Sequence, residues 1–177
     1  MIRCVVAGEE PGGKSVVVSD ATLEFTPVAL LGPETQFFRL WGSDQVSELP
    51  NNGTPPEFDA YFPPPGGFRF MASTLGPDAS RPAAVEDVDS AMAELEAAMP
   101  GFQQWADPDN PHMHRTDTID FDIVVSGEVW LELDDGAEVH LQAGDCVILN
   151  GVRHAWHNHS TAPCQIFGAV IGATRSH

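Results

Sequence analysis

"HMHRTDTIDFDIVVSGEVWLELDDGAEVHLQAGDCVILNGVRHAWHN", residues 112–158, carries the clearest structural pattern of the chain. Short β-rich runs alternate there with turn signals at Ser126-Gly127, residues 134–136 and residues 143–145. The pair Asp135-Gly136 between "VWLEL" and "EVHLQ" is a strong signal for a hairpin. Short strands with turns every eight to twelve residues or so are typical of an antiparallel sandwich or barrel. The sequence therefore predicts an all-β fold.

Strand signals also precede and follow this stretch. Residues 3–10 and 14–20 flank Pro11-Gly12-Gly13, which predicts two short strands joined by a turn. Residues 35–42 and 68–75 have the composition of further strands, and "CQIFGAVIG" supplies a last apolar strand. The segment "NNGTPPEFDAYFPPPGG" is too rich in proline for a helix or a central strand, so we expect an ordered loop.

Residues 82–99 predict the one convincing helix of the chain. Apolar side chains recur at helical spacing from Val85 to Met99, with acidic side chains on the other faces. Pro82 suits a first helical turn, and Pro100-Gly101 ends the pattern.

At 177 residues the chain is expected to form a single domain. We divide it into N-terminal strands and proline-rich loops at residues 1–81, the helix at residues 82–99 and a barrel core at residues 105–173.

The charge of the chain limits its partners. It holds 8 Lys and Arg against 26 Asp and Glu, a formal net charge of -18. Phosphate backbones and anionic membrane surfaces would repel such a protein, so neither nucleic acid nor a membrane is an expected partner. No apolar run approaches the roughly 20 residues that span a bilayer, and the first residues lack the order of a signal peptide.

Three cysteines, Cys4, Cys146 and Cys164, are odd in number and lack CxxC spacing. We therefore expect buried free thiols and a cytoplasmic protein.

Two segments resemble the paired motifs of the cupin superfamily. Its first motif runs His-x-His, a few residues, Glu, six residues and Gly, and residues 112–127 follow this order, with Asp120 in the place of the Glu. Its second motif runs from a glycine through a further glycine to His and then Asn, and residues 144–158 follow that order. The phrases "MHRTDTIDF" and "GVRHAWHN" look similar to one group of small single-domain cupins. The motif region covers about a third of the chain.

The resemblance implies a double-stranded β-helix, a jelly-roll-like antiparallel barrel, with metal ligands that point into its lumen. The ligands carried over by the motifs are His112, His114, Asp120 and His154. Asp117 is an alternative acid, although it lies closer to His114 than the motif spacing wants.

Elementary chemistry agrees with this ligand set. Side chains two apart on a strand point to the same face, so His112 and His114 are able to look inward together. Neutral imidazoles and one carboxylate suit Fe, Mn, Ni, Cu or Zn, whereas calcium needs more oxygen ligands. A lone histidine on a β face is more often an ordinary polar residue, but three in motif register favour a divalent transition metal.

Other polar and aromatic residues receive more ordinary interpretations. Arg115 and Asp117 are candidates to act on a substrate or, more simply, to pair with each other at the mouth of the barrel. His157 and His159 are interpreted as loop or rim residues, and His140 as a strand residue that faces outward. Aromatic core packing is the simplest role for the tryptophans Trp105, Trp130 and Trp156.

The preferred hypothesis is a metal-dependent enzyme acting on a small oxygenated organic molecule. The metal would activate a carbonyl, enol or hydroxyl oxygen, while Asp120 or Asp117 would move a proton, as in a dehydratase, lyase or isomerase. An Fe(II)-dependent dioxygenase is one alternative, and a non-catalytic cupin that binds a small ligand is another. Because an exposed edge strand such as "KSVVVSD" is hazardous, we also expect a homodimer.

Overall fold

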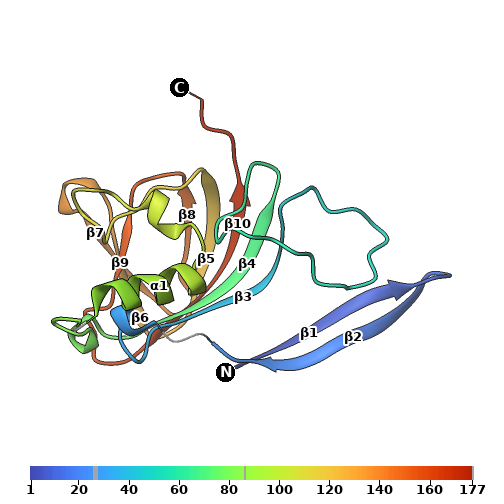
Figure 1. Cartoon of the computed structure of the whole chain (residues 1–177), viewed down its shortest axis with the longest axis horizontal. Coiled ribbons are helices and arrows are strands. Elements are labelled where there is room, and N and C mark those ends of the chain that lie inside the picture. Colours follow the sequence, from blue (N-terminus) through green and yellow to red (C-terminus); the bar gives the residue numbers. More distant parts are fainter. Residues whose placement is uncertain (26–27, 86, 177) are drawn as a thin grey trace.

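The computed structural model describes residues 1–25, 28–85 and 87–176, and these form two facing antiparallel sheets and a projecting hairpin (Figure 1). The larger sheet has the strand order β3-β4-β10-β5-β8, with β3 Gln36–Ser43, β4 Phe68–Leu75, β10 Cys164–Gly172, β5 Thr118–Ser126 and β8 Cys146–Asn150. The smaller sheet has the order β7-β6-β9, with β7 Glu138–Gln142, β6 Glu128–Glu132 and β9 Ala155–His157. Strands β3 and β4 from before residue 81 therefore share one sheet with β5, β8 and β10 from after residue 112.

The turn between β6 and β7 lies at the Asp135-Gly136 pair that the sequence analysis identified. Asp135 and Gly136 both adopt positive φ, at 59° and 70°, and the Leu133 amide donates to the Ala137 carbonyl at 2.8 Å. Positive φ at these positions is what Asp-Gly favours in a tight turn. The predicted hairpin is confirmed.

The main core lies between the two sheets. It joins buried side chains from β4, β5, β8 and β10 of the larger sheet to those of β6 and β7, namely Leu75, Val124, Val129, Leu131, Leu141, Leu149, Cys164 and Ile166. Trp156 packs against the same cluster from β9. Removal of these apolar surfaces from water is the main force that holds the sheets together.

A second core lies beneath the helix α1, Val88–Ala98, which covers one end of the inner face of the larger sheet. Leu95 and Met99 contact a cluster that includes Met71 of β4 and Val170 of β10. The helix begins six residues later than the predicted start at Pro82, because the Asp87 carboxylate accepts from the Ser90 amide at 2.9 Å and caps the first turn there. Within the predicted helix, Glu86 lies outside the described residues.

Four short 3₁₀ segments lie in the connections between the strands and the helix. They are η1 Ala29–Leu31, η2 Asp78–Ser80, η3 Phe102–Trp105 and η4 Asp134–Gly136. The proline-rich stretch at residues 51–67 forms no strand or helix, as expected. No helix among the described residues combines the length and apolarity that crossing a bilayer requires.

The N-terminal hairpin pairs β1 Ile2–Glu10 with β2 Lys14–Leu23 and projects away from the sheets (Figure 1). Only its base joins a third cluster, in which Ile2, Leu23 and Phe25 pack on Phe38, Leu40 and Ala72 of β3 and β4. We call this hairpin the arm. The predicted turn at residues 11–13 is confirmed by positive φ at Gly12 and Gly13.

The three thiols are free, but they are not all buried as expected. Cys164 is buried in the main core, Cys4 is half-buried, and Cys146 is exposed. The prediction was wrong for Cys146 because this residue lies on the outward face of β8, where Val147 and Leu149 turn inward.

Candidate metal centre

Two of the predicted histidines meet inside the protein. His114 and His154 form an antiparallel bridge in which each backbone amide donates to the other's carbonyl, at 2.9 and 3.0 Å. Their ring centroids lie 4.3 Å apart. Because this bridge fixes both backbones, the two imidazoles remain adjacent. The structure thereby brings together one histidine from each predicted motif.

The His154 ring is oriented by its own loop. Its Nδ1 lies 3.0 Å from the Val152 carbonyl oxygen, which only accepts, so Nδ1 carries the proton and Nε2 keeps its lone pair. Burial lowers the pKa of His154, and only 2% of the residue is exposed. A neutral imidazole with one nitrogen bonded to a carbonyl and the other free is the usual state of a metal-binding histidine.

Aromatic rings enclose His114. Its imidazole stacks on Phe62 at a centroid distance of 6.0 Å and contacts Phe102 at 5.2 Å. Burial, and then the neighbouring His154, lower the pKa of His114 to about 3. Phe62 and Phe102 belong to the second core, while Trp156, which meets His154 at 6.1 Å, belongs to the main core. The histidine pair thus lies where the two cores meet.

Asp120 points inward from β5 at the end of a hydrogen-bonded row of hydroxyls. The Thr118 hydroxyl donates to the Asp120 carboxylate at 2.6 Å, and the Thr116 and Thr118 hydroxyls lie 2.7 Å apart. Burial raises the pKa of Asp120 to about 6, against the opposing effect of the Thr118 hydrogen bond. This carboxyl is therefore able to exchange a proton near neutral pH.

Asp122 is a second inward carboxyl that the sequence analysis missed. Burial, and then the charge of Asp120, raise its pKa to about 7. The absent side chain of Gly168 on β10 makes room for it, because a Cβ there would lie 2.2 Å from the Asp122 Oδ1 atom. The signal was available in the sequence, since residue 122 must share a strand face with residue 120.

His112 does not join the pair. It lies exposed in a turn, where its amide donates to the Asn110 side chain at 3.2 Å, and β5 begins only at Thr118. The strand alternation that would place His112 beside His114 therefore does not apply. Among the described residues, no three His, Cys, Asp or Glu side chains are arranged to hold a metal ion. The four-ligand set His112, His114, Asp120 and His154 stays a prediction, of which His114 and His154 fit a transition metal in donor type and position.

Arg115 and Asp117 do not form the expected pair. The Asp117 carboxylate accepts from Arg175 Nε at 2.5 Å, and Arg175 also donates to the Thr116 and Gly151 carbonyls. Arg115 is exposed, and its amide donates to the Trp105 carbonyl. Asp117 therefore fastens the C-terminal segment to the strand entrance, and its role as the site acid has no support in these contacts.

Three further histidines, His140, His157 and His159, lie on the outer side of the smaller sheet. His140 is exposed and stacks on Trp130 at 4.3 Å, so the outward orientation predicted for it is confirmed. His157 at the end of β9 pairs with Glu132 at 2.6 Å, and the exposed His159 lies 3.1 Å from Glu138. Trp105 and Trp156 pack into the cores as expected, whereas Trp130 does not.

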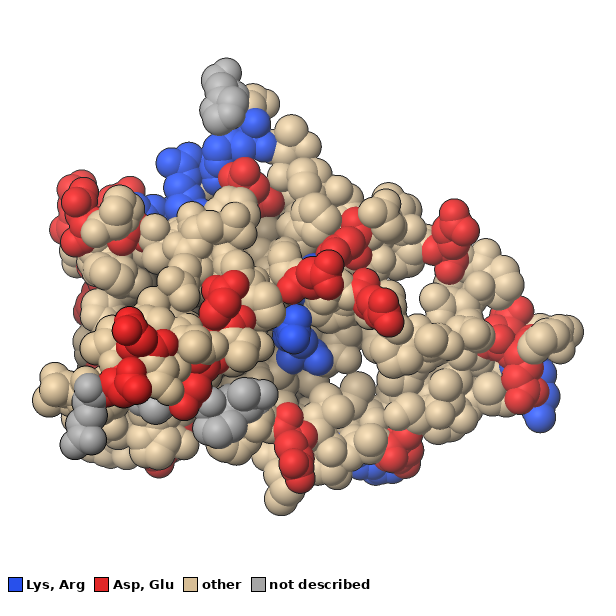
Figure 2. Space-filling view, in the orientation of Figure 1, with Lys and Arg blue, Asp and Glu red and all other residues tan. Residues whose placement is uncertain are grey.

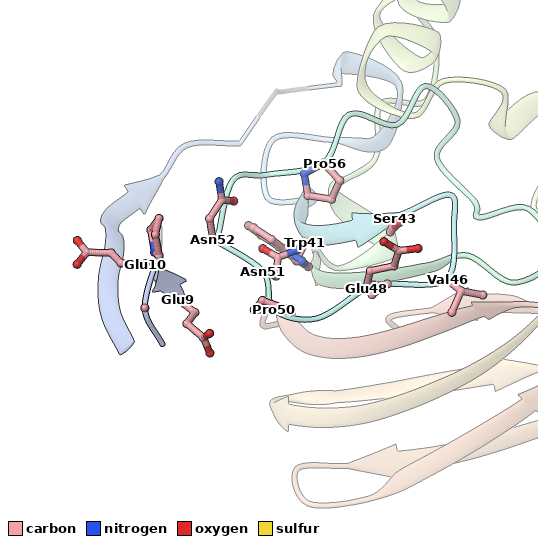
Figure 3. Close-up of a pocket in the computed structure, with 13 residues that line it drawn as sticks. Glu9, Glu10, Trp41, Ser43, Val46, Glu48, Pro50, Asn51, Asn52 and Pro56 are labelled. Atoms are coloured by element: carbon pink, nitrogen blue, oxygen red, sulfur yellow. The ribbon is translucent and has the colours of Figure 1, made fainter. Parts of the chain in front are cut away.

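Two open clefts in the structure lie away from the histidines. The larger, of about 620 Å³, separates the arm from the loop that follows β3 and is lined by Glu9, Trp41, Glu48 and Asn52 among others (Figure 3). The smaller, of about 460 Å³, is lined by Arg39, Trp41 and Phe58 among others. Neither cleft is lined by a histidine, so the His114–His154 pair lies in neither of them.

Comparison with known families agrees with this geometry. Residues 103–170 match the model of the Cupin_2 family, described as a cupin domain. This chain carries a cupin domain. The match spans β5 to β10 almost completely, and the two facing antiparallel sheets are the layers of its double-stranded β-helix.

Curated relatives resemble a short part of the chain. "Phomopsin biosynthesis cluster protein C'" of Diaporthe leptostromiformis is 44% identical over 48 residues, which cover 27% of this chain and 25% of that protein. "Oryzines biosynthesis cluster protein J" of Aspergillus oryzae is 40% identical over 50 residues, 28% of each chain. The matches thus span about a quarter of these relatives' length.

Among solved structures, the cupin domain of Schizosaccharomyces pombe Cnp3 aligns with a TM-score of 0.49 and 8% identity. That alignment covers 97% of this chain and 88% of the Cnp3 chain.

Proposed function

We propose that the chain is a cupin enzyme that acts on a small oxygenated organic molecule beside the His114–His154 pair. The observation that carries the proposal is this pair of neutral imidazoles, of which His154 is buried, with a free Nε2, and His114 is half-buried among aromatic rings. Neutral imidazoles in an apolar surround are suited to a divalent transition metal such as Fe, Mn, Ni, Cu or Zn. Such an ion, when bound, would polarise a carbonyl, enol or hydroxyl oxygen.

The chain's own residues supply the proton transfer. Asp120 and Asp122, with pKa values of about 6 and about 7, are each able to hold a proton or release it near neutral pH. The Thr118 hydroxyl fixes the orientation of the Asp120 carboxylate. Phe62 and Phe102 shield His114 from water. These features favour a dehydratase, lyase or isomerase type of reaction.

The names of the curated relatives support a role in the synthesis of an organic product. Both printed names refer to a biosynthesis cluster, and both relatives match this chain at 40% identity or more over the short shared segment. We therefore propose an intermediate of such a synthesis as the substrate class.

The first test measures metal in protein purified without added metal. We expect near-stoichiometric transition metal in the native chain and a metal content at least about tenfold lower in His154→Ala, because one of the two proposed imidazole ligands is removed. His159→Ala is the matched control, since this histidine is exposed on the outer side, and it should keep its metal. A native chain that holds no metal and takes up none of the five ions would overturn the metal-dependent proposal.

The second test distinguishes reaction types. We expect solvent deuterium to enter keto or hydroxy compounds of a substrate panel, and Asp122→Asn to slow this exchange. Oxygen consumption with a panel compound, in place of deuterium exchange, would instead establish the Fe(II)-dependent dioxygenase. Tight binding of a compound with neither reaction would establish a non-catalytic binding cupin.

A further inference from the structure

The larger of the two clefts lies between the arm and the loop at residues 46–56, and the proposed function does not use it. Its volume of about 620 Å³ is within the roughly 300–1,000 Å³ of small-molecule sites. The half-buried indole of Trp41 lies between the arm and Glu48 (Figure 3). Three prolines supply further apolar wall, namely Pro11, Pro50 and Pro56. The cleft therefore offers a ligand an aromatic surface with apolar surroundings.

The protein itself holds the walls of this cleft in place. The Glu9 amide donates to the Asn51 carbonyl at 2.9 Å, so the arm is bonded to the loop. The two backbones also touch at Gly8, where a Cβ atom would lie 2.4 Å from the Asn52 carbonyl oxygen. Only glycine permits so close an approach. Walls that are fixed in advance reduce the ordering cost that a ligand has to meet.

Three of the neutral polar side chains that line the cleft are committed to turns of the loop. The Asn51 and Asn52 side-chain oxygens each accept from the amide two residues ahead, at 2.7 and 3.0 Å. The Ser43 hydroxyl donates to the Gln45 carbonyl at 2.9 Å and accepts from the Gln45 amide at 3.1 Å. The acceptors that remain for a ligand are therefore mainly carboxylates.

The charged groups of the cleft all carry the same sign. Glu9, Glu10 and Glu48 line it, and no Lys or Arg stands among the described residues that do so. Glu10 pairs with Lys14 at 3.9 Å, and its carboxylate points away from Trp41 in Figure 3. Within the described part of the chain, the Glu9 and Glu48 carboxylates form neither an ion pair nor a hydrogen bond. Acidic side chains also outnumber basic ones on the face of the molecule that Figure 2 displays, so no nearby excess of positive charge offsets them.

We propose that the larger cleft binds a small organic ammonium ion. A cation is attracted to the face of an aromatic ring, and tryptophan attracts it most strongly. The carboxylates of Glu9 and Glu48, one on each side of Trp41, add a Coulomb attraction (Figure 3). An anion would be repelled by the same carboxylates, and a neutral ligand would leave them without a counter-charge. An ammonium that carries apolar groups complements both the indole and the acids.

This site is separate from the proposed metal centre. Trp41 belongs to β3, which is an edge strand of the larger sheet, and no histidine stands among the described residues that line the cleft. The inference therefore does not depend on the proposed function. Substitutions in the cleft should leave the metal content of the chain unchanged, so failure of one proposal is distinguishable from failure of the other.

An NMR titration of the full chain with choline, at an ionic strength of about 10 mM, tests the inference. We expect a saturable shift of the Trp41 indole N–H signal, which the Trp41→Phe variant identifies among the four tryptophans. The neutral isostere 3,3-dimethylbutan-1-ol has the shape of choline without its charge, and it should bind at least about tenfold more weakly. A short peptide with one trimethyllysine carries the same cationic group, so its affinity relative to choline tells whether the ammonium belongs to a peptide side chain or to a free molecule.

Glutamine variants of the two free carboxylates measure their part in binding. Glu9→Gln and Glu48→Gln change exposed residues, so the fold should be retained, and each should weaken choline binding about threefold at low salt. Glu24→Gln is the matched control, since Glu24 is exposed just after β2 and lines neither cleft, and it should leave the affinity unchanged. Equal affinity for the isostere, no shift of Trp41 at about 50 mM choline, or binding that Glu9→Gln and Glu48→Gln both leave unchanged would each overturn the inference.

Discussion

Consecutive strands β6 and β5 distribute their side chains in opposite ways. On β6, Val129 and Leu131 are buried between the sheets while the charged Glu128 and Glu132 lie toward the outside. On β5 the inward positions begin with Thr118, Asp120 and Asp122, and the outward positions hold Phe121, Ile123 and Val125. A strand with one wet face normally places apolar residues inside and polar residues outside. β6 follows that rule, and β5 reverses it until Val124 restores it.

Such a reversal has to be explained on both faces. Carboxyls that point inward lose hydration, and this loss raises the pKa values of Asp120 and Asp122. Buried carboxyls with raised pKa values destabilise a fold when they ionise, and they are found most often where they serve a reaction. Apolar side chains that point outward meet water unless another molecule covers them. The inward face leads to the proposed enzyme site, and the outward face offers a contact surface for the homodimer expected from the sequence.

The largest expected effect is the difference between two single variants, each of which places an aspartate at one of two adjacent residues of β5. Val124 is 2% exposed in the main core, and Val125 is 48% exposed on the outer face of the larger sheet. Val124→Asp should lower the free energy of unfolding by about 4 kcal/mol, because it buries an unpaired carboxylate. Val125→Asp should change it by less than about 0.5 kcal/mol in the monomer. Urea denaturation at low protein concentration measures both.

The same pair also separates folding from association. At high concentration Val125→Asp should weaken the homodimer expected from the sequence while leaving the monomer's urea midpoint unchanged. Equal destabilisation of the monomer by the two variants would show that Val125 is a core residue, and the contrast between the two faces of β5 would be lost.

The next effect concerns Asp122 and the pH. Its folded pKa of about 7 exceeds its ordinary value of 3.8, so this group's contribution to stability is full below pH 4 and is lost as the pH rises toward 7. Asp122→Asn removes this pH-dependent loss of stability, because an amide side chain does not titrate in this range. The variant's advantage over the native chain should therefore grow by about 3 kcal/mol between pH 4 and pH 8.

Thermal or urea unfolding in the presence of a chelator checks this prediction, because a bound cation would lower the carboxyl's pKa. His114 acts in the opposite direction, since its pKa of about 3 removes stability as the pH falls from 6.5. That contribution is common to both proteins and cancels in the difference. A difference that does not change with pH would mean that Asp122 is hydrated and ionised throughout.

The strands and turns were predictable from sequence because they depend on local patterns. Gly12-Gly13 and Asp135-Gly136 form the turns that their backbone freedom favours, and the alternation in residues 68–75 coincides with β4. The helix was placed too early because its apolar spacing began before Asp87, the residue whose side chain caps it. Local spacing identified the helix, and a single side-chain contact set its start.

The site was predictable only in part. His114 and His154 belong to separate motifs, and the structure brings them together as the motif order suggested. His112 was placed inward by assuming a strand that begins only at Thr118. The partner of Asp117 was also out of reach, because Arg175 lies 58 residues away and only the folded sheet brings it near. Contacts between distant segments leave no signal in a local pattern.

The smallest effect decides which of two neighbouring acids belongs to the site. Asp117 and Arg175 pair at a partly exposed position, so Asp117→Asn should cost at most about 0.5 kcal/mol of unfolding free energy, and less in high salt. Arg175 keeps its bonds to the Thr116 and Gly151 carbonyls, so the entrance to β5 should remain in place. Asp120→Asn is the matched comparison, and it should slow deuterium exchange where Asp117→Asn does not. If Asp117→Asn abolishes the exchange and Asp120→Asn leaves it unchanged, the working acid lies at the strand entrance and the inward face of β5 has only a structural role.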